Sequence, residues 1–301
     1  MKIVIAGGTG FLGRPLTDAL VSDGHTVVHL SRQGGAPGHP VRRVGWNPDG
    51  STGPWASEID GADVIINLAS ESIGPRRWSP ARKRRIVDSR VLSTRSLVAG
   101  VGAAAAPPAL FLSSSGVGYY GPLDDRIATE ETPAGHDFLA TVCATSEDEA
   151  TRAASARTRV VCARGGLILA RHGGALAPML LAFRFGVGGP VGSGRQYWPW
   201  IHLQDWIDMI RFTIATPAVV GPLNVTGPEP VTNKEFAKAL GRAIHRPAFM
   251  PAPAFALRLL FGELADGLLL SGQRAVPAKA QRLGFKFKFE TLHAALANLF
   301  P

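Results

Sequence analysis

A glycine-rich loop stands near the start of the chain, between an apolar run and a helix-like segment. Gly7, Gly10 and Gly13 have the spacing GxxGxxG and directly follow the run KIVIA at residues 2–6. The pyrophosphate of a dinucleotide needs a tight turn, close approach of the backbone, and a helix N-terminus whose free N–H groups face the anion. Because this loop joins a strand to a helix, its context favours phosphate binding over glycines that only make a turn.

Apolar runs alternate with helix-like segments through the first half of the chain. Runs of β-branched residues and Leu without polar alternation are typical of strands that are buried on both faces. We therefore predict an α/β fold, with a doubly wound parallel sheet of the Rossmann type. The expected strands are residues 2–6, 26–30, 63–69, 109–113 and 159–163, and the expected helices are 11–21, 78–99, 137–152, 203–215 and 233–244.

The composition changes after about residue 171, where Gly-rich and aromatic segments begin. We predict a dinucleotide-binding domain at 1–171 and a smaller C-terminal substrate-binding domain at 172–301. The segment 200–226 is expected to return to the sheet, and the run FKFKF at 285–289 reads as strand-like. Trp198, Trp200 and His202 would either line a substrate cleft or belong to the core.

Ser31 and Arg32 stand at the end of the second expected strand. A site that prefers NAD places Asp or Glu there, on the ribose hydroxyls. An acidic side chain would repel a 2′-phosphate, whereas a hydroxyl and a guanidinium bind it. Unless Arg32 is only a solvated surface residue, the pair favours NADP as the cofactor.

The chain of 301 residues has a formal net charge of +9, which favours anionic partners. Two cysteines make neither a disulfide framework nor a metal cluster, and no apolar stretch reaches the length of a membrane span. With no leader pattern at the N-terminus, we expect a cytoplasmic protein that binds no membrane and no metal.

A run of basic residues invites a nucleic-acid interpretation. An apolar helical stripe that includes Ile86, Val91 and Leu97 leaves the basic residues largely on the solvated face, and no helix-turn-helix, zinc or RNP signature accompanies them. We therefore expect no nucleic-acid partner. The basic residues are Arg76, Arg77, Arg82, Lys83, Arg84, Arg85 and Arg90.

The loop GGTGFLG resembles that of the extended short-chain dehydrogenases/reductases, the group that contains the sugar-nucleotide epimerases and dehydratases. Further motifs resemble one atypical branch, the epimerase-like proteins of the YfcH type, whose substrate is unknown and which carry a characteristic C-terminal domain. The resemblance covers nearly the whole chain and implies an NADP-binding Rossmann protein. The motifs are NLASESI (67–73), RRW (76–78), SGVGYYG (115–121), GGPVGSGRQYWPWIHLQD (188–205) and GQRAVPAKAQRLGFKF (272–287).

The resemblance also implies a set of cofactor contacts. Glu71, Arg76 and Arg164 belong to this set, although all three would alternatively form salt bridges within the protein. The full set is Gly7, Thr9, Gly10, Phe11, Leu12 and Gly13 at the pyrophosphate, Ser31 and Arg32 at the 2′-phosphate, Asn67, Leu68 and Ala69 under the adenosine ribose, Glu71 and Arg76 in the loop facing the cleft, and Arg164 at a strand end.

The short-chain enzymes use Tyr and Lys four residues apart on a helix, where the ammonium lowers the pKa of the phenol. The chain has no YxxxK sequence, and the corresponding helix offers Cys143 and Glu147. A carboxylate raises the pKa of a nearby thiol, which is the wrong direction for a base. Members of the branch usually have Trp before this Glu, where Ser146 stands here.

Ser115 and Tyr120 are therefore the candidate catalytic residues, because both stand at the carboxyl edge of the fifth expected strand, which ends in Ser113, Ser114 and Ser115. Arg164 or Arg76 would stabilise a Tyr120 phenolate in place of the absent lysine. Alternatively, the three serines are only a polar strand end and Tyr120 packs over the cofactor.

Together these features predict an NADP-dependent oxidoreductase or epimerase-like enzyme that acts on a small molecule, which the resemblance suggests is a sugar nucleotide. The alternative is a regulator or interaction protein that binds NADP and has lost the chemistry together with the Tyr–Lys pair.

Overall fold

The computed structural model describes residues 1–32, 34, 41–74 and 76–301. Its centre is a seven-stranded sheet in the order β11-β7-β5-β4-β1-β2-β3, in which every neighbouring pair is parallel. The strands are β1 (Lys2–Ala6), β2 (Thr26–Ser31), β3 (Arg42–Gly45), β4 (Val64–Asn67), β5 (Leu110–Gly116), β7 (Arg159–Gly165) and β11 (Gly221–Val225).

The strand order reverses beside β1, which pairs with β2 on one side and with β4 on the other. Ala6 is in register with Leu30 of β2 and with Asn67 of β4. Open parallel sheets bind their ligands outside the carboxyl ends of the strands at such a switch point. The loop that follows Ala6 therefore lies where a ligand is expected.

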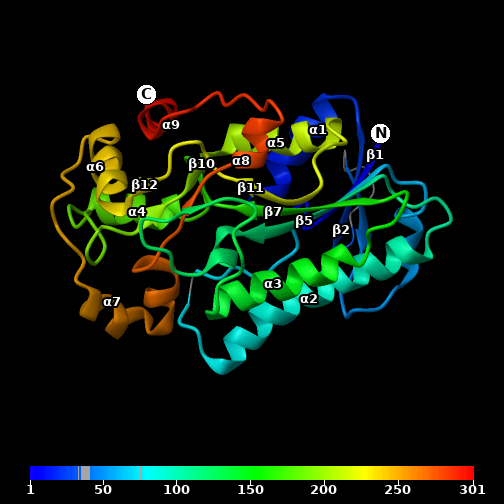
Figure 1. Cartoon of the computed structure of the whole chain (residues 1–301), viewed down its shortest axis with the longest axis horizontal. Helices are drawn as coiled ribbons and strands as arrows, with labels where there is room; N and C mark the ends of the chain where they lie inside the picture. Colours follow the sequence, from blue (N-terminus) through cyan, green and yellow to red (C-terminus); the bar gives the residue numbers. More distant parts are fainter. Residues whose placement is uncertain (33, 35–40, 75) are drawn as a thin grey trace.

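Helices cover both faces of the sheet (Figure 1). Helices α2 and α3 lie on one face, while α1, α5 and α8 lie on the other. The α-helices are α1 (Gly13–Ser22), α2 (Pro80–Ala103), α3 (Phe138–Thr151), α4 (Leu176–Arg184), α5 (Leu203–Ala215), α6 (Asn233–Ala243), α7 (Ala254–Phe261), α8 (Ala278–Arg282) and α9 (Leu292–Leu299), and short helical turns occur at η1 (Pro54–Glu58), η2 (Val117–Tyr120) and η3 (Ala265–Leu269).

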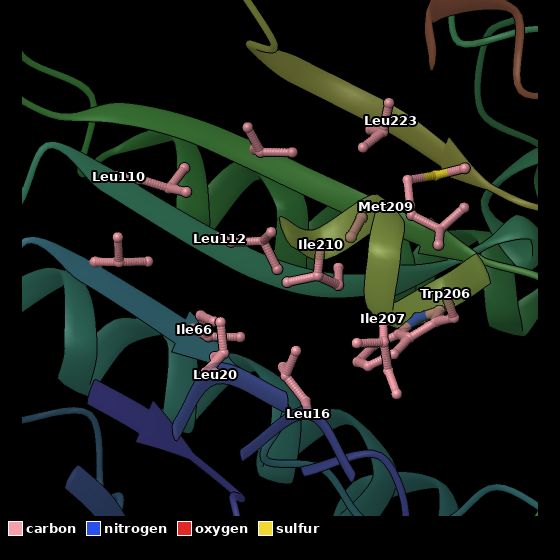
Figure 2. Close-up of a cluster of buried hydrophobic side chains, with 14 of the residues drawn as sticks. Leu16, Leu20, Ile66, Leu110, Leu112, Trp206, Ile207, Met209, Ile210 and Leu223 are labelled. Atoms are coloured by element: carbon pink, nitrogen blue, oxygen red, sulfur yellow. The ribbon is translucent and has the colours of Figure 1, made fainter. Parts of the chain in front are cut away.

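The core under α1 and α5 is apolar and continuous (Figure 2). Leu16 and Leu20 of α1 lie in one buried cluster with Leu112 of β5 and with Trp206 and Ile210 of α5. Apolar residues on both faces of the strands explain why β1, β4 and β5 read as unbroken hydrophobic runs. The helix expected at 203–215 is confirmed with the same bounds.

The C-terminal part has its own core, in which Trp198 and Trp200 pack with Phe236 and Leu240 of α6. His202 is also buried, so these aromatic residues belong to the core. The short strands outside the seven-stranded sheet are β6 (Ile127–Ala128), β8 (Leu167–Leu169), β9 (Tyr197–Trp198), β10 (Trp200–His202), β12 (Val231–Thr232) and β13 (Arg274–Ala275).

Two features differ from the sequence-based expectations. Strand β3 was not expected, because its sequence RRVG is short and polar and its strand nature comes from pairing with β2. The strand-like interpretation of 285–289 is wrong, since this segment pairs with no strand of the described chain. The Asp205 carboxylate accepts the N–H groups of Lys288 and Phe289 at 2.8 and 3.0 Å and replaces a neighbouring strand as their partner.

No helix in the described part of the chain is both long and apolar enough to cross a membrane. Within that part, no group of three or more His, Cys, Asp or Glu side chains is placed to hold a metal ion.

Candidate dinucleotide site

The loop after β1 leaves no room for side chains at two of its glycines. Gly7 has a φ of +79°, and a Cβ there would lie 2.9 Å from the backbone nitrogen of Ala69. A Cβ on Gly13 would lie 2.5 Å from the carbonyl oxygen of Gly7. Glycine is therefore required by the packing of the loop against the end of β4 and against itself.

At the N-terminus of α1, Gly10 and Phe11 of the loop are exposed, and Thr9 and Leu12 beside them are half-buried. Among the residues that the structure describes, no side chain caps this helix, whose N-cap position is Leu12. Uncapped N–H groups together with the helix dipole form a natural binding surface for a phosphate group. The Phe11 ring lies over two glycines, because a Cβ on Gly173 or Gly174 would come within 3.0 Å of its ring atoms.

The end of β2 lies beside this loop, since the N–H of Gly7 donates to the carbonyl of Leu30 at 3.3 Å. Ser31 is half-buried and Arg32 is exposed. The edge next to the phosphate loop therefore presents a hydroxyl and a guanidinium at the position where an NAD-specific site carries a carboxylate. These residues fit a cofactor that carries a 2′-phosphate.

The end of β4 forms the other side of the loop. Asn67 is buried, donates its amide to Thr94 Oγ1 at 3.1 Å, and accepts the N–H of Ala69 at 3.2 Å. Leu68 donates its N–H to Ala6 at 2.9 Å. These contacts fix residues 67–69 against Gly7, so that the adenosine half of a cofactor would meet backbone at this point.

Glu71 and Arg76 lie in the loop that follows β4. The Glu71 carboxylate pairs with Arg82, and with Arg85 at 3.4 Å. The expectation that Arg82 lies on a solvated face is wrong, because its side chain is buried on Glu71 and on the carbonyl of Ser72. Arg76 is exposed, so of the two predicted residues only Arg76 keeps its charge open to solvent.

Arg164 and Glu147 form a buried ion pair at the carboxyl end of β7. Arg164 Nε donates to Glu147 Oε1 at 2.9 Å and Nη2 donates to Oε2 at 2.7 Å. Arg164 is 3% exposed and Glu147 is 8% exposed. Burial would lower the pKa of Arg164, but its hydrogen bonds to Glu147 raise it overall, so the guanidinium stays charged.

Two tyrosines surround this ion pair. The Arg164 guanidinium lies 3.3 Å from the centroid of the Tyr119 ring, and Arg164 Nη1 donates to the Tyr120 hydroxyl at 3.1 Å. The Tyr120 hydroxyl donates in turn to Asn224 Oδ1 at 2.6 Å. Burial raises the pKa of Tyr120 to about 12, although Arg164 acts in the opposite direction. A neutral Tyr120 is therefore a hydrogen-bond donor at neutral pH.

Ser115 connects the end of β5 to the same ion pair. Its hydroxyl donates to Glu147 Oε1 at 2.7 Å, and its side chain is half-buried. Burial raises the pKa of the nearby Cys143 thiol. The hydrogen bond with Ser115 lowers this pKa, but by less than burial raises it. Ser113 is 3% exposed, and its hydroxyl has no partner among the described residues. The end of β5 therefore presents hydroxyl groups beside a fixed carboxylate.

The structure brings Ser115, Tyr120 and Arg164 into one cluster, whereas Arg76 is exposed to solvent. The sequence alone does not show that Glu147 joins Ser115 to Arg164, or that Asn224 accepts the hydrogen bond of the Tyr120 hydroxyl. The sequence offered two signals of this contact, which are a Glu on the inner face of the helix and an Arg at the end of a strand. Neither shows which residue is its partner.

Comparisons with known proteins show which family the sequence matches. Residues 3–226 match the NAD dependent epimerase/dehydratase family, and residues 252–299 match a domain of unknown function, DUF1731. The Mycobacterium tuberculosis protein MT2273, described as an epimerase family protein, is 42% identical over 295 residues, which cover 98% of this chain and 96% of the relative.

Two solved structures are similar over the whole chain. The human epimerase family protein SDR39U1, crystallised with NADPH, is 35% identical with a TM-score of 0.91 over 99% of both chains. The nucleoside-diphosphate sugar epimerase from Corynebacterium glutamicum is 31% identical with a TM-score of 0.79, over 100% of this chain and 58% of that one.

Proposed function

Because the chain belongs to the NAD dependent epimerase/dehydratase family, we propose that it binds NADP(H) at the carboxyl edge of its sheet and acts on a small molecule. The observation that carries the cofactor is the edge beside the phosphate loop, where Ser31 and Arg32 stand and an acidic residue is missing. The NADPH in the similar human structure supports the same choice.

In this proposal, residues 9–12 and the glycines around them hold the pyrophosphate, and Ser31 and Arg32 hold the 2′-phosphate. Asn67, Leu68 and Ala69 border the adenosine ribose. Arg76 remains a candidate contact because it is exposed, whereas Glu71 and Arg164 are held by internal ion pairs and act by positioning their neighbours.

The proposed reaction is an oxidoreduction or an epimerisation, for which the bound nicotinamide would supply hydride transfer. Ser115 is the group that we expect to touch the substrate oxygen, because its hydroxyl is half-buried and is oriented by Glu147. Tyr120 was the other candidate. With a pKa of about 12 and two hydrogen bonds, it serves better to position Arg164 than to accept a proton.

A sugar nucleotide is the substrate class that we propose, supported by the name of the similar Corynebacterium glutamicum epimerase. We place the protein in the cytoplasm because both its cysteines are free thiols. The competing candidate is a non-catalytic NADP-binding regulator, favoured by a neutral Cys143 thiol where the short-chain enzymes carry tyrosine.

Two measurements test the proposal in sequence. Calorimetric titration should give a Kd for NADPH at least about tenfold lower than that for NADH, the ratio that about 1.4 kcal/mol produces. Equal affinities, or no binding of either, would contradict the cofactor assignment. The loaded protein is then incubated with a panel of nucleoside-diphosphate sugars, and the products and the cofactor absorbance are followed.

Turnover that is lost in Ser115→Ala supports an enzyme, since removing a group that acts on the reacting proton typically costs about 10²- to 10⁴-fold in rate. Tight NADPH binding with no conversion of any sugar in the panel would contradict the proposed substrate class and favour the regulator.

A further inference from the structure

A groove of about 690 Å³ lies on the C-terminal part of the molecule, away from the dinucleotide site. One of its walls is a face of α6, where Lys234, Lys238 and Arg242 follow one another at every fourth residue. His245 and Arg246 extend this wall beyond the end of the helix. The three helical positions span about 12 Å along the helix axis, at 1.5 Å per residue.

The charge of this wall is not compensated within the described part of the chain. In the described residues, no lysine or arginine of this wall forms an ion pair. By contrast, the buried Arg164 is paired with Glu147. The acidic residue of α6, Glu235, is occupied in the capping box with Thr232, at 2.7 Å from its hydroxyl. The groove therefore carries an uncompensated positive potential.

A second wall of the groove is apolar and is formed by Pro190, Ala248, Phe249 and Pro251. Phe249 is 72% exposed, and next to it Met250 is 46% exposed. The two segments of this wall are joined by backbone hydrogen bonds, because Met250 donates to Gly188 at 3.3 Å and Ala252 donates to Pro190 at 2.8 Å.

The apolar surface continues past the rim of the groove. Val187, which precedes Gly188, is 56% exposed, and Phe185 at the end of α4 is 75% exposed. Figure 1 shows α4 and α6 together at one end of the molecule, with the chain between α6 and α7 running along the outside. Contiguous exposed apolar side chains of this kind mark interaction sites.

We propose that this groove binds an acidic, amphipathic polypeptide segment of a partner protein. Its carboxylates would face Lys238 and Arg242, and its apolar side chains would lie on Phe249 and Met250. Helix-in-groove recognition uses this division into a charged face and an apolar face. The opposite charges would also steer the encounter.

Two other polyanions fit the surface less well. A bilayer is flat and cannot enter a groove. A single-stranded nucleic acid stacks its successive bases on several aromatic rings, whereas the described lining of the groove offers one phenyl ring, Phe249, beside the aliphatic Pro190, Ala248 and Pro251. A polypeptide uses both walls. This inference does not depend on the proposed cofactor, since the groove residues are not those of the dinucleotide site.

The test is a fluorescence anisotropy titration of the full chain with a labelled peptide of about twelve residues, carrying Glu on one helical face and Leu and Phe on the other. The charge-reversal variant is Lys238→Glu/Arg242→Glu, and its control is Arg126→Glu/Arg157→Glu, which makes the same charge change at exposed residues outside the groove. The apolar variant is Phe249→Ala, with Ile127→Ala as its exposed control. Circular dichroism confirms that every variant is folded.

We expect peptide binding that weakens at least about tenfold in the groove charge variant and severalfold in Phe249→Ala, with the controls close to wild type. A peptide of Glu alone should bind more weakly than the amphipathic peptide. Equal binding by wild type and the groove variants overturns the inference. It is also overturned if a single-stranded 20-mer oligonucleotide or phosphatidylserine vesicles, tested in parallel, bind through these residues while the peptide does not.

Discussion

Arg164 and Glu147 meet in a two-point contact, with Nε 2.9 Å from Oε1 and Nη2 2.7 Å from Oε2. Arg164 comes from β7 and Glu147 from α3, so the pair ties that helix to the sheet. The short-chain enzymes resembled by this chain carry lysine on the helix at the position of Glu147. Here the positive charge near the site comes from a strand, and the helix supplies the carboxylate.

Glu147→Gln should destabilise the fold by about 3–5 kcal/mol, because it leaves the buried charge of Arg164 unbalanced. Urea unfolding at pH 7 measures this free energy. The double variant Glu147→Leu/Arg164→Met, which removes both charges, should recover much of the loss. Asp266→Asn is the control, since the Arg258–Asp266 pair is exposed and solvent screens its attraction. If Glu147→Gln lowers the free energy of unfolding by as little as the control does, then the fold does not depend on the buried ion pair.

The central strands of the sheet were predictable because their sequences are unbroken apolar runs, whereas the short polar edge strand β3 was not. KIVIA and its counterparts are buried on both faces, and the helix expected at 203–215 has a regular apolar stripe that packs on them. The glycine loop was predictable because a tight turn of this kind tolerates few residue types. The strands, this helix and the glycine loop are each specified by residues that are close to one another in the sequence.

The cluster around Arg164 was less predictable, because its contacts join distant parts of the chain. Tyr120 and Asn224 are 104 residues apart, and no local pattern specifies that their side chains meet. The burial of Arg82 has the same origin: its helical position suggested solvent, but Glu71 from the preceding loop folds back over it. Which polar side chains form hydrogen bonds or ion pairs over long sequence distances can therefore be identified only from the tertiary structure.

Arg32→Asp should weaken NADPH binding at least about tenfold and leave NADH binding unchanged or tighter, because a carboxylate repels a 2′-phosphate and accepts hydrogen bonds from ribose hydroxyls. Calorimetric titration of both cofactors gives the two affinities. Arg157→Asp, an exposed arginine far along the chain, is the matched control. If the ratio of NADPH affinity to NADH affinity is the same in Arg32→Asp as in wild type, then a residue other than Arg32 binds the 2′-phosphate.

Gly13→Ala should abolish NADPH binding and lower stability by more than 1 kcal/mol, because the new Cβ would lie 2.5 Å from the Gly7 carbonyl oxygen and displace the loop. Gly102→Ala is the control at another helical glycine, where no atom lies within 4 Å of the new Cβ. There the substitution should be neutral or stabilise by about 0.5–1 kcal/mol. Thermal unfolding with and without NADPH measures the stability of Gly13→Ala and Gly102→Ala and the stabilisation of each by the cofactor. Equal stability and equal stabilisation in the two variants would be inconsistent with a closely packed loop.

Tyr120 should make stability fall at alkaline pH. Its pKa is raised to about 12 in the fold from 10.0, so its contribution is full below pH 10 and is lost as pH rises from 10 to 12. Between pH 9 and pH 11 the wild type should lose about 1 kcal/mol more of its free energy of unfolding than Tyr120→Phe loses. Urea unfolding at the two pH values measures the difference. Equal losses would mean that Tyr120 ionises in the fold as readily as in the unfolded chain.

His202 should give the fold a sensitivity to mild acid. Its ring is buried, and Nδ1 accepts the N–H of Gln204 at 3.1 Å as the N-cap of α5. Burial lowers the pKa of His202, so the unfolded chain takes up a proton first as pH falls. The contribution is therefore fully present above about pH 6.5 and is lost progressively below it.

His202→Asn tests this, because Asn also caps helices well but does not titrate. We expect the free energy of unfolding to fall less steeply between pH 6.5 and pH 5 in His202→Asn than in wild type, by up to about 1.4 kcal/mol per pH unit. His293→Asn at an exposed histidine should keep the wild-type slope. If His202→Asn keeps that slope too, then the folded protein binds a proton at His202 as readily as the unfolded chain does, and the acid sensitivity arises elsewhere.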